Sequence, residues 1–482
     1  MNFFISTSIP YVNAQPHIGF LWEILIADCF ARFARRQGQT AFFLTGTDEN
    51  GLNIAKVAEE QDVATKTFVD QNVTKFQALK GSFNLNLDHF IRTTSSEHKQ
   101  AVYKFWALCQ ADIEIGFYRG LYCYSCEAYY DEDETVESNC PVHRQPLEKF
   151  EEKNYFFKLT RYLSEVQKLI ETEKLKILPE SKKHATLNML KSGRLKDLSI
   201  SRDKKRSRDW GIPVPADSTQ IIYVWFDALV NYISGLGFGS KTEKNFEQFW
   251  QNGQVWHFVG KDIFKFHTIY WPAMLLSAGL KLPAVIHVHE FILNEGEKMS
   301  KTKGNVVLPA DLLAKYEVDV VRYYLLAQDP FADFNFSWSH LKSIYEGELK
   351  NEIGNLSGRI FGLLKRTSLE KIALKHNLLQ VELNAVTEEY QSSFQKAHFS
   401  IGLKKVFSLV KRANQFIEDK KLWEGIQAGR AGPELSTLIL LLKNLADFYA
   451  PVMPEKSKVI TDALALHSNV FFNRHLDFKP LF

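Results

Sequence analysis

The chain has 482 residues, of which 45% are hydrophobic and 24% are charged, and its net charge is +3. This length is too great for one hydrophobic core, so three or four domains are expected, and the composition is that of an ordinary folded protein. The nearly balanced charge excludes a general polyanion-binding coat but permits local basic surfaces.

No membrane span and no secretory signal are predicted. The apolar run 435–442 is followed by Lys443 and is far too short to cross a bilayer. The first ten residues have no basic flank and no small-residue cleavage site. Five cysteines, three of them clustered with a histidine, indicate a metal site in a reducing compartment rather than a disulfide framework. A cytoplasmic protein is therefore expected.

The N-terminal segments alternate between strand and helix patterns. Residues 3–9 form an apolar run ended by Pro10, which predicts a buried strand. Residues 17–38 repeat apolar side chains at three- and four-residue steps, which predicts a helix. A second strand is predicted at 40–45. This order is typical of a doubly wound parallel sheet, in which His17 would lie where such folds bind phosphates.

The pattern changes twice further along the chain. Between about 116 and 215, cysteines, clustered acids and a basic run indicate an insertion. Apolar runs predict that the sheet resumes at 220–225, 255–259 and 284–288. From about residue 345 to the end, the spacing of apolar residues predicts long amphipathic helices.

His17-Ile-Gly19 opens the first predicted helix. A histidine there can donate to phosphate oxygens, while the unpaired backbone N–H groups and the helix dipole add positive potential. Glycine allows a flat base to approach the backbone closely. Taken alone, His17 would be interpreted as a capping or core histidine.

Lys298-Met-Ser300-Lys301 lies between Gly296 and Gly304. A bendable loop that carries two ammonium groups can close over a triphosphate and stabilise charge on departing pyrophosphate. The alternative is a solvated basic loop. The order of the two motifs in one chain favours a shared ATP site, with Mg²⁺ bound mainly by the phosphates and water.

Three cysteines and a histidine have the spacing of a zinc site. Cys123-x2-Cys126 and Cys140-x2-His143 are two short-spaced pairs that can place three thiolates and an imidazole tetrahedrally around Zn²⁺. Such a closed site is structural rather than catalytic. Redox-active or metal-free cysteines are the alternative.

These motifs resemble the methionyl-tRNA synthetases, class I aminoacyl-tRNA synthetases, of the bacterial or organellar type with a single zinc knuckle. The resemblance runs through nearly the whole chain. Its further matching stretches are Ile9-Pro-Tyr11, Thr45-Gly-Thr-Asp48-Glu49, Tyr122-Cys-Tyr-Ser-Cys126, Trp210-Gly-Ile-Pro-Val-Pro215, Tyr223-Val-Trp225-Phe-Asp-Ala228, Gly260-Lys-Asp262, Phe266-His267 and Trp271-Pro-Ala.

The resemblance implies an enzyme that activates L-methionine with ATP to methionyl-adenylate and pyrophosphate, then transfers the methionyl group to initiator and elongator tRNA(Met). The substrate carboxylate would attack the α-phosphorus, so catalysis would consist of positioning and electrostatics. The cofactors implied are one structural Zn²⁺ and the Mg²⁺ that accompanies ATP. Because no further domain follows the helices, a monomer is expected.

The fold implied is α/β, with a doubly wound parallel (Rossmann-like) catalytic domain, a zinc-knuckle insertion and a helical-bundle anticodon-binding domain. The corresponding domain boundaries are 1–115 and 216–295 for the two halves of the catalytic domain, 116–215 for the insertion, 296–344 for the lysine loop and stem-contact segment, and 345–482 for the anticodon-binding domain.

The resemblance also assigns roles to individual residues. The catalytic set is His17, Gly19, Lys298, Ser300 and Lys301. The ATP-binding set is His17, Gly19, Gly260, Asp262 and Lys301. The methionine-binding set is Ile9, Tyr11, Asp48, Trp225, Ala228, Tyr232, Phe266, His267 and Trp271. An aromatic lining suits a polarisable thioether, and Asp48 suits the α-ammonium group, although each aromatic alone would be interpreted as core.

Asn355, Arg359 and Trp423 fall where the family reads the anticodon. Asn and Arg can hydrogen-bond base edges, and an indole offers a stacking face. The alternatives are a solvated helix face for the first two residues and a core edge for Trp423.

Four positions depart from the family pattern. Phe20 replaces a histidine, and a phenyl ring cannot donate to phosphate. Glu290 replaces a glycine, and its carboxylate would repel a nearby triphosphate unless paired or turned away. Asn50 in place of a histidine and Leu229 in place of a proline are milder changes.

Two other functions remain open at this point. A synthetase for leucine, isoleucine or valine would need a large editing insertion, because one methylene discriminates only about 10–200-fold. The insertion of roughly one hundred residues is too small for that domain. A catalytically silent RNA-binding protein is favoured only by Phe20 and Glu290.

Overall fold

The computed structural model describes residues 1–123, 128–130, 135, 137, 139–141, 144–299, 304–369, 371–375, 377–427, 431–464, 470–472 and 480–482. The chain folds into two compact units, the first formed by residues 1–16 and 37–289 and the second by residues 17–36 and 290–482. None of the described helices has both the length and the apolar character that a membrane crossing requires.

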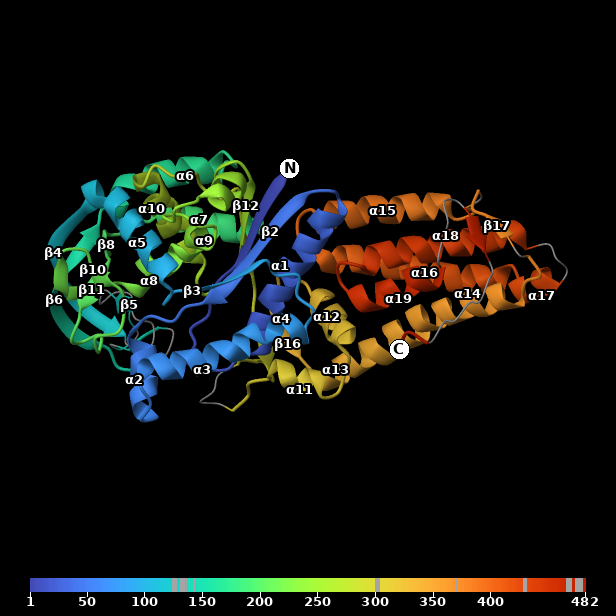
Figure 1. The fold of residues 1–482 in the computed structure, drawn as a ribbon, viewed down its shortest axis with the longest axis horizontal. Helices are drawn as coiled ribbons and strands as arrows, with labels where there is room; N and C mark the ends of the chain where they lie inside the picture. Colours follow the sequence, from blue (N-terminus) through green and yellow to red (C-terminus); the bar gives the residue numbers. More distant parts are fainter. Residues whose placement is uncertain are drawn as a thin grey trace. The chain divides into compact units, whose positions relative to one another are not determined.

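A six-stranded sheet is the framework of the first unit (Figure 1). Every neighbouring pair of strands is parallel, in the order β3-β2-β1-β12-β13-β7. The strands are β1 (Asn2–Thr7), β2 (Thr40–Thr47), β3 (His89–Arg92), β7 (Lys176–Leu178), β12 (Gln254–Gly260) and β13 (Val285–His289). The strand order changes direction between β1 and β12, where such sheets open a crevice at their carboxyl ends. The predicted doubly wound parallel sheet is confirmed.

The central strands are apolar because they are buried on both faces. Phe4 of β1 and Val255 and Val259 of β12 are fully buried. Strands of this kind read as continuous apolar runs rather than alternating ones, which is why the sequence pattern located them. Their side chains share one core with helices of the same unit.

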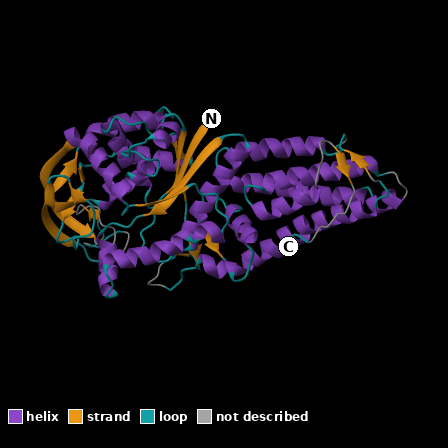
Figure 2. Cartoon of the chain, viewed as in Figure 1, coloured by secondary structure: helices purple, strands orange, loops and turns teal. Residues whose placement is uncertain are grey.

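Figure 2 shows helices of the first unit beside the sheet strands. The α-helices are α2 (Leu52–Glu60), α3 (Thr65–Gln77), α4 (Leu79–Ser82), α5 (Ser96–Leu108), α6 (Leu163–Glu171), α7 (Glu180–Lys191), α8 (Val224–Leu229), α9 (Asn231–Ser234) and α10 (Trp271–Ser277). The 3-10 helices are η1 (Gln110–Asp112) and η3 (Leu159–Tyr162), and the π-helices are η4 (Phe246–Gln251) and η5 (Phe266–Tyr270).

The prediction of a main-sheet strand at 220–225 is wrong about where the strand ends and about which sheet it joins. Strand β11 (Asp217–Ile222) stops before Trp225, which lies in α8. It pairs antiparallel with β9 (Ser201–Asp203) and β10 (Pro213–Val214) in a separate sheet. A short apolar run fits a buried strand and a buried helix equally well, so the pattern could not find the boundary.

Two strands of the main sheet were not predicted. Strand β3 and strand β7 contain only four and three residues, too few for a periodic signal. Strand β7 belongs to the segment predicted as an insertion, yet it pairs with β13 at the edge of the main sheet. The chain therefore returns to the sheet from within 116–215.

Other strands of that segment build a four-stranded antiparallel sheet in the order β5-β4-β6-β8. Its strands are β4 (Ile113–Cys123), β5 (Ala128–Tyr130), β6 (Glu148–Phe157) and β8 (Leu198–Ser199). The first predicted zinc ligand, Cys123, is the last residue of β4.

The second unit consists mainly of helices, as predicted from residue 345 onward (Figure 1). Its helices are α1 (Ile18–Arg36), α11 (Pro309–Leu313), α12 (Val318–Leu326), α13 (Trp338–Ser343), η7 (Ile344–Gly354), α14 (Asn355–Arg366), α15 (Gln380–Phe394), α16 (Phe399–Asp419), α17 (Leu422–Gln427), α18 (Gly432–Tyr449) and α19 (Pro454–Leu464). Its strands are β14 (Ile292–Asn294), β15 (Glu297–Lys298), β16 (Phe334–Phe336), β17 (Lys371–Ala373) and β18 (Val470–Phe472).

A buried arginine connects three parts of this second unit. Arg322 of α12 donates from Nη2 to Oδ2 of Asp28 in α1, at 2.7 Å. It also donates to the carbonyl oxygens of Pro451 (3.0 Å) and Val452 (2.8 Å), which lie between α18 and α19. Both charged side chains are fully buried. The ion pair and these hydrogen bonds hold α1 to α12 and to the end of α18.

Candidate active site

The carboxyl ends of β1 and β2 bring two predicted methionine-binding residues together. Tyr11 and Asp48 form a parallel bridge. The Asp48 N–H donates to the carbonyl of Pro10 at 2.9 Å, and the Val12 N–H donates to the carbonyl of Asp48 at 3.3 Å. Asp48 is only 4% exposed. Ile9 is partly buried against the same core. A carboxylate therefore lies at the crevice end of the sheet.

The next residue, Glu49, fixes this turn through an ion pair. Its carboxylate accepts from Arg92 Nε at 2.8 Å and Nη2 at 2.9 Å, and from Thr47 Oγ1 at 2.7 Å. The N–H of Glu49 donates to Thr93 Oγ1 at 2.9 Å. The carboxylate of Glu49 is thus neutralised by a guanidinium.

Aromatic residues of α8, α9, η5 and α10 form a cluster in the same unit. The rings of Trp225 and Phe266 stack, with centroids 3.7 Å apart and planes at 6°. Trp271 is fully buried, with its ring centroid 6.1 Å from that of Tyr232. Ala228 is buried in α8. All nine residues of the predicted methionine set belong to the first unit.

A buried histidine supplies an oriented polar group within this cluster. His267 Nδ1 lies 3.0 Å from the carbonyl oxygen of Ile263, which can only accept, so Nδ1 carries the ring proton. The Tyr232 hydroxyl then donates to His267 Nε2 at 2.6 Å. Burial lowers the pKa of His267 to about 4, so the ring is neutral at physiological pH.

His257 of β12 is a residue of this cluster that the sequence did not indicate. Its ring centroid lies 4.1 Å from that of Tyr232, and its Nδ1 is 2.6 Å from Ser6 Oγ. Burial lowers the pKa of His257 well below its ordinary value. Because it sits inside the apolar run of β12, no motif distinguished it from a core residue.

The departure at Asn50 has a structural role. Asn50 Nδ2 donates to Asp227 Oδ2 at 3.0 Å. The other oxygen of Asp227 is 3.3 Å from His98 Nε2, and His98 Nδ1 is 2.8 Å from Ser234 Oγ. Burial raises the pKa of Asp227. This network anchors α8, the helix that carries Trp225 and Ala228. Leu229, another departure, is a buried core residue.

The two motifs predicted to share an ATP site begin at His17 and Lys298, and both residues belong to the second unit. His17 Nδ1 accepts from the Gly19 N–H at 3.0 Å, so the proton of a neutral ring is on Nε2, the atom that can donate to a phosphate. A β-carbon at Gly19 would lie 2.8 Å from His17 Cε1, so a larger residue at this position would displace the His17 ring. Phe20 is 8% exposed and packs in the core.

The lysine motif that begins at Lys298 falls partly outside the described residues, which include neither Ser300 nor Lys301. Lys298 ends strand β15, and its backbone is described. Gly296 and Gly304 on either side have positive φ values of 78° and 64°, which favour glycine. The Ile18 N–H donates to the carbonyl of Val307 at 3.1 Å, so the chain just after the loop is bonded to the start of α1.

Gly260 and Asp262, of the predicted ATP set, lie at the carboxyl end of β12 in the first unit. A β-carbon at Gly260 would lie 3.1 Å from Asp262 Oδ1 and 3.6 Å from His289 Cε1. The Lys261 N–H donates to the carbonyl of His289 at 3.0 Å, which holds this turn. Glu290 departs from the family pattern, and its backbone N–H donates to the carbonyl of Pro330 at 2.9 Å.

Comparison with known proteins identifies the family. The model of the family "tRNA synthetases class I (M)" matches residues 3–149 and 142–361. The methionine–tRNA ligase of Caldanaerobacter subterraneus subsp. tengcongensis is 37% identical over 479 residues, covering 96% of this chain and 74% of the relative. That of Rickettsia prowazekii is 36% identical over 489 residues, covering 98% of this chain and 95% of the relative. This chain belongs to the methionine–tRNA ligase family.

Solved structures of the family have the same fold. The Mycobacterium tuberculosis methionyl-tRNA synthetase in complex with methionyl-adenylate superposes with a TM-score of 0.91 at 32% identity, covering 97% of this chain and 94% of that one. The apo form of the same synthetase has a TM-score of 0.84 at 29% identity. The predicted family, fold class and enzyme class are confirmed.

The residues predicted to read the anticodon of a methionine tRNA lie on contacting helices, α14 and α17. Asn355 is exposed, and Trp423 is 38% exposed although it is a large aromatic. Arg359 Nη2 donates to Glu418 Oε1 of α16 at 2.5 Å. Trp423 is thus not a core residue, and Arg359 is held by an ion pair.

Two of the four predicted zinc ligands of this synthetase can be placed. Cys123 and Cys140 are 2% and 1% exposed. The Cys140 N–H donates to the carbonyl of Gln145 at 2.8 Å, and the Arg144 N–H donates to the carbonyl of Cys140 at the same distance, so Cys140 starts a tight turn. Cys126 and His143 lie outside the described residues. Within the part of the chain that is described, no group of three or more potential ligands forms.

Proposed function

We propose that the chain joins L-methionine to tRNA(Met) with the residues described above. As a member of the methionine–tRNA ligases, it activates methionine with ATP and then transfers the methionyl group to the tRNA. In the first step the methionine carboxylate oxygen bonds to the α-phosphorus of ATP, and the bond from that phosphorus to pyrophosphate breaks. In the second step a terminal ribose hydroxyl forms an ester with the methionyl carbon, and AMP leaves.

The observation that supports methionine binding best is the juxtaposition of a buried carboxylate turn with a buried aromatic cluster in one unit. Asp48 would pair with the α-ammonium group. Trp225, Phe266 and Trp271 would surround the thioether, whose sulfur is polarisable and favours aromatic contacts. The neutral pair of Tyr232 and His267 would add one oriented polar group without a buried charge.

For ATP, His17 would donate from Nε2 to a phosphate, and Gly19 keeps the turn compact. Lys298 and Lys301 would neutralise the departing pyrophosphate, with Gly260 and Asp262 also assigned to ATP by their place in the family motif. Mg²⁺ would arrive with the nucleotide and supply charge neutralisation at the phosphates. Phe20 is buried, so the phosphate contact of the usual histidine would fall to the lysines.

A structural zinc ion fits the residues that can be placed. Two cysteine thiols, Cys123 and Cys140, are buried and lie at a strand end and in a tight turn, as in closed zinc knuckles. Cys126 and His143 would complete the tetrahedron. The ion would hold β4 and the turn at Cys140 together.

For the tRNA, we propose that Asn355, Arg359 and Trp423 contact the anticodon. The exposed indole of Trp423 provides a stacking face, and Asn355 and Arg359 provide hydrogen bonds to base edges. Contacting helices α14 and α17 carry all three residues.

The test is amino-acid-dependent exchange of labelled pyrophosphate into ATP by the purified chain. Methionine should drive exchange, and leucine, isoleucine and valine should not. Lys301→Ala should slow the exchange while leaving the affinity for methionine unchanged, because its charge acts mainly in the transition state. Absence of exchange with every amino acid would favour the silent RNA-binding alternative.

A further inference from the structure

The second unit contains a cavity of about 390 Å³ that none of the predicted sites uses. Helices α12, α13, η7 and α16 and strand β16 line it (Figure 1). A volume of this size suits a small organic molecule, since ligand sites typically enclose about 300–1,000 Å³. We call it the Glu348 cavity, and the residues that give it its character are Tyr323, Gln328, Phe334, Glu348, Lys404 and Phe407.

Glu348 supplies the cavity with a carboxylate that has no cationic partner. Its Oε2 accepts from the Tyr323 hydroxyl at 2.7 Å. Burial raises the pKa of Tyr323 well above its ordinary value, so the phenol keeps its proton and remains the donor. Within the described part of the chain, half-buried Glu348 forms no ion pair. A carboxylate that is partly withdrawn from water in this way favours a cation beside it.

The other polar side chains of the lining leave this demand unmet. Gln328 donates from Nε2 to the carbonyl of Tyr324 at 2.8 Å, which leaves its Oε1 as an acceptor. Asp329 Oδ1 already lies 3.0 Å from His398 Nε2. Lys404 is exposed, and among the described residues it pairs with neither carboxylate of the lining. The side-chain acceptors that remain inside the cavity are therefore those of Glu348 and Gln328.

An unusual backbone presents Glu348 to the cavity. The residue lies in η7, a π-helix of 11 residues. Such helices are rare and frequently occur at functional sites. The π-helix η5 likewise carries Phe266 and His267 of the predicted methionine set. In η7, the same rare conformation places a carboxylate on a cavity wall.

The rest of the lining is mainly aromatic and aliphatic. Phe334 of β16, Phe407 of α16 and the ring of Tyr323 contribute aromatic surface. Aromatic faces attract cations through their negative potential. Ile344 and Leu403 add aliphatic surface. The lining thus combines a carboxylate with apolar walls, which suits a charged amine carried on an apolar body.

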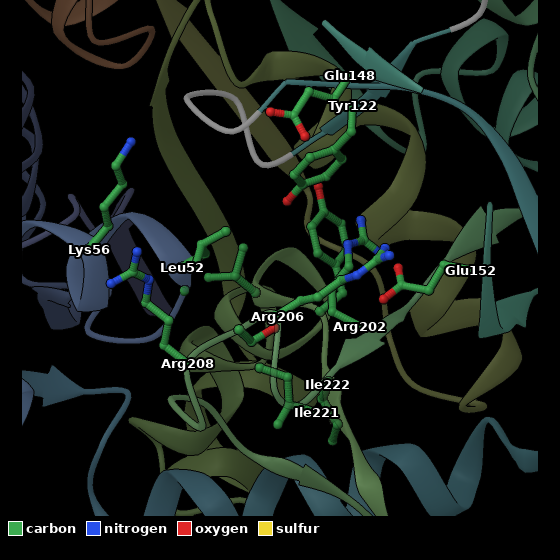
Figure 3. Close-up of a pocket in the computed structure, with 14 residues that line it drawn as sticks. Leu52, Lys56, Tyr122, Glu148, Glu152, Arg202, Arg206, Arg208, Ile221 and Ile222 are labelled. Atoms are coloured by element: carbon green, nitrogen blue, oxygen red, sulfur yellow. The ribbon is translucent and has the colours of Figure 1, made fainter. Parts of the chain in front are cut away.

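The cavity of the first unit in Figure 3 has the opposite character. Its volume is about 570 Å³, and among the described residues four basic side chains and two carboxylates line it. The basic residues are Lys56, Arg202, Arg206 and Arg208, and the acidic ones are Glu148 and Glu152. A cationic ligand would be repelled there, so charge distinguishes the two cavities.

We propose that the Glu348 cavity binds a small organic ammonium ion, a protonated amine attached to a short apolar body. The ammonium group donates to Glu348 Oε1, and Gln328 Oε1 offers a second acceptor. The apolar body lies against Phe334 and Phe407. A metal ion is the poorer occupant, because no group of three or more potential metal ligands forms within the part of the chain that is described.

The test is calorimetric titration of the purified chain with phenethylamine. Phenethyl alcohol, which has nearly the same shape but no charge, is the matched ligand. Both titrations contain saturating L-methionine, because the proposed methionine site also combines a carboxylate with aromatic rings. The unaltered chain should bind a single phenethylamine under these conditions and should bind the alcohol about tenfold more weakly or less, since hydrogen bonds to charged groups are the stronger ones.

Four variants locate the site. Glu348→Gln keeps an acceptor for Tyr323 but removes the charge, and it should weaken phenethylamine binding about tenfold or more. Glu346→Gln, at an exposed residue of the same π-helix that does not line the cavity, should leave the affinity unchanged. Phe407→Leu should weaken binding about threefold through loss of an aromatic face. Lys404→Ala should not weaken it.

The absence of saturable binding of phenethylamine, equal affinity for the alcohol, or equal losses in Glu348→Gln and Glu346→Gln would overturn the proposal. Weaker binding by Lys404→Ala would indicate an anionic occupant and would overturn it as well. Unchanged methionine-dependent pyrophosphate exchange in Glu348→Gln shows that the variant is folded. The titration requires neither ATP nor tRNA, so its outcome is independent of the proposed function.

Discussion

At the scale of single residues, the hydrogen bond from Tyr232 to His267 Nε2 is the polar feature of the aromatic cluster. Tyr232→Phe would leave the buried nitrogen without its donor, at a cost of about 1–3 kcal/mol. We expect the KM for methionine to rise about tenfold or more in pyrophosphate exchange, with the KM for ATP unchanged. The control is Tyr390→Phe, which removes a buried hydroxyl bonded to the Phe448 carbonyl in the second unit. An equal effect of both changes would contradict a local role.

Asp319 gives a pH-dependent prediction. It is almost fully buried, and burial raises its pKa from 3.8 to about 6. Because the folded chain binds this proton more tightly, the stability that Asp319 contributes is complete below about pH 3.8 and is lost as pH rises through 6.

Asp319→Asn keeps an oxygen that can accept from the Lys456 N–H, now 2.7 Å from Asp319 Oδ2, but cannot ionise. Relative to the unaltered chain, the variant should gain up to about 3 kcal/mol in free energy of unfolding between pH 4 and 7. Urea unfolding of both proteins at pH 4.5 and 7.5 measures this difference. A difference that does not change with pH would count against the elevated pKa.

Sequence reasoning found the residues that carry recognisable chemistry and missed those that act through packing. Asp48 and His267 stand in motifs, Tyr232 was assigned by the family resemblance, and the structure brings all three into one unit. His257 lies in an apolar strand, and only its 4.1 Å distance to Tyr232 shows that it belongs with them.

At the scale of secondary structure elements, the buried Arg322 joins α1, α12 and the end of α18. Arg322→Ala would remove the buried partner of Asp28, which also pairs with Arg32, whose Nε is 2.8 Å from Asp28 Oδ2. Loss of one member of a buried ion pair costs about 3–5 kcal/mol, so urea unfolding should shift by that amount. Arg32→Ala, which leaves the buried pair intact, should cost clearly less. Equal losses would mean that the buried pair is not the dominant link.

Element boundaries show where sequence patterns stop being informative. The runs at 3–9 and 255–259 are buried on both faces and became parallel strands. The run at 220–225 was equally apolar, but its second half became the start of α8. Burial explains both outcomes, and the choice between strand and helix there depends on tertiary partners that the sequence does not reveal.

At the scale of the whole molecule, amino-acid activation and tRNA recognition should be separable. Trp423→Ala should leave methionine-dependent pyrophosphate exchange unchanged but lower the efficiency of tRNA(Met) charging about tenfold, since one base–aromatic stack is worth about 1–3 kcal/mol. Val459→Ala, at a similarly exposed apolar residue of α19, is the matched control. A parallel fall in exchange would mean that the tryptophan is structural.

Zinc content is a second whole-molecule prediction. Elemental analysis of the purified chain should find about one zinc ion per molecule, and Cys126→Ser should lower that value and loosen the fold of the segment around β4. Limited proteolysis of both proteins measures the second effect. Active protein without bound metal would contradict the assignment.

Strand β7 lies within segment 116–215 but pairs in the main sheet, so this segment cannot be removed without damage to the sheet. A shortened chain that lacked 116–215 would lose the outermost strand of the sheet and expose the backbone amides and carbonyls of β13. Such bare edges recruit strands from other molecules, so the truncated protein should aggregate instead of yielding a minimal synthetase. Any attempt to graft or excise the knuckle must spare Lys176–Leu178.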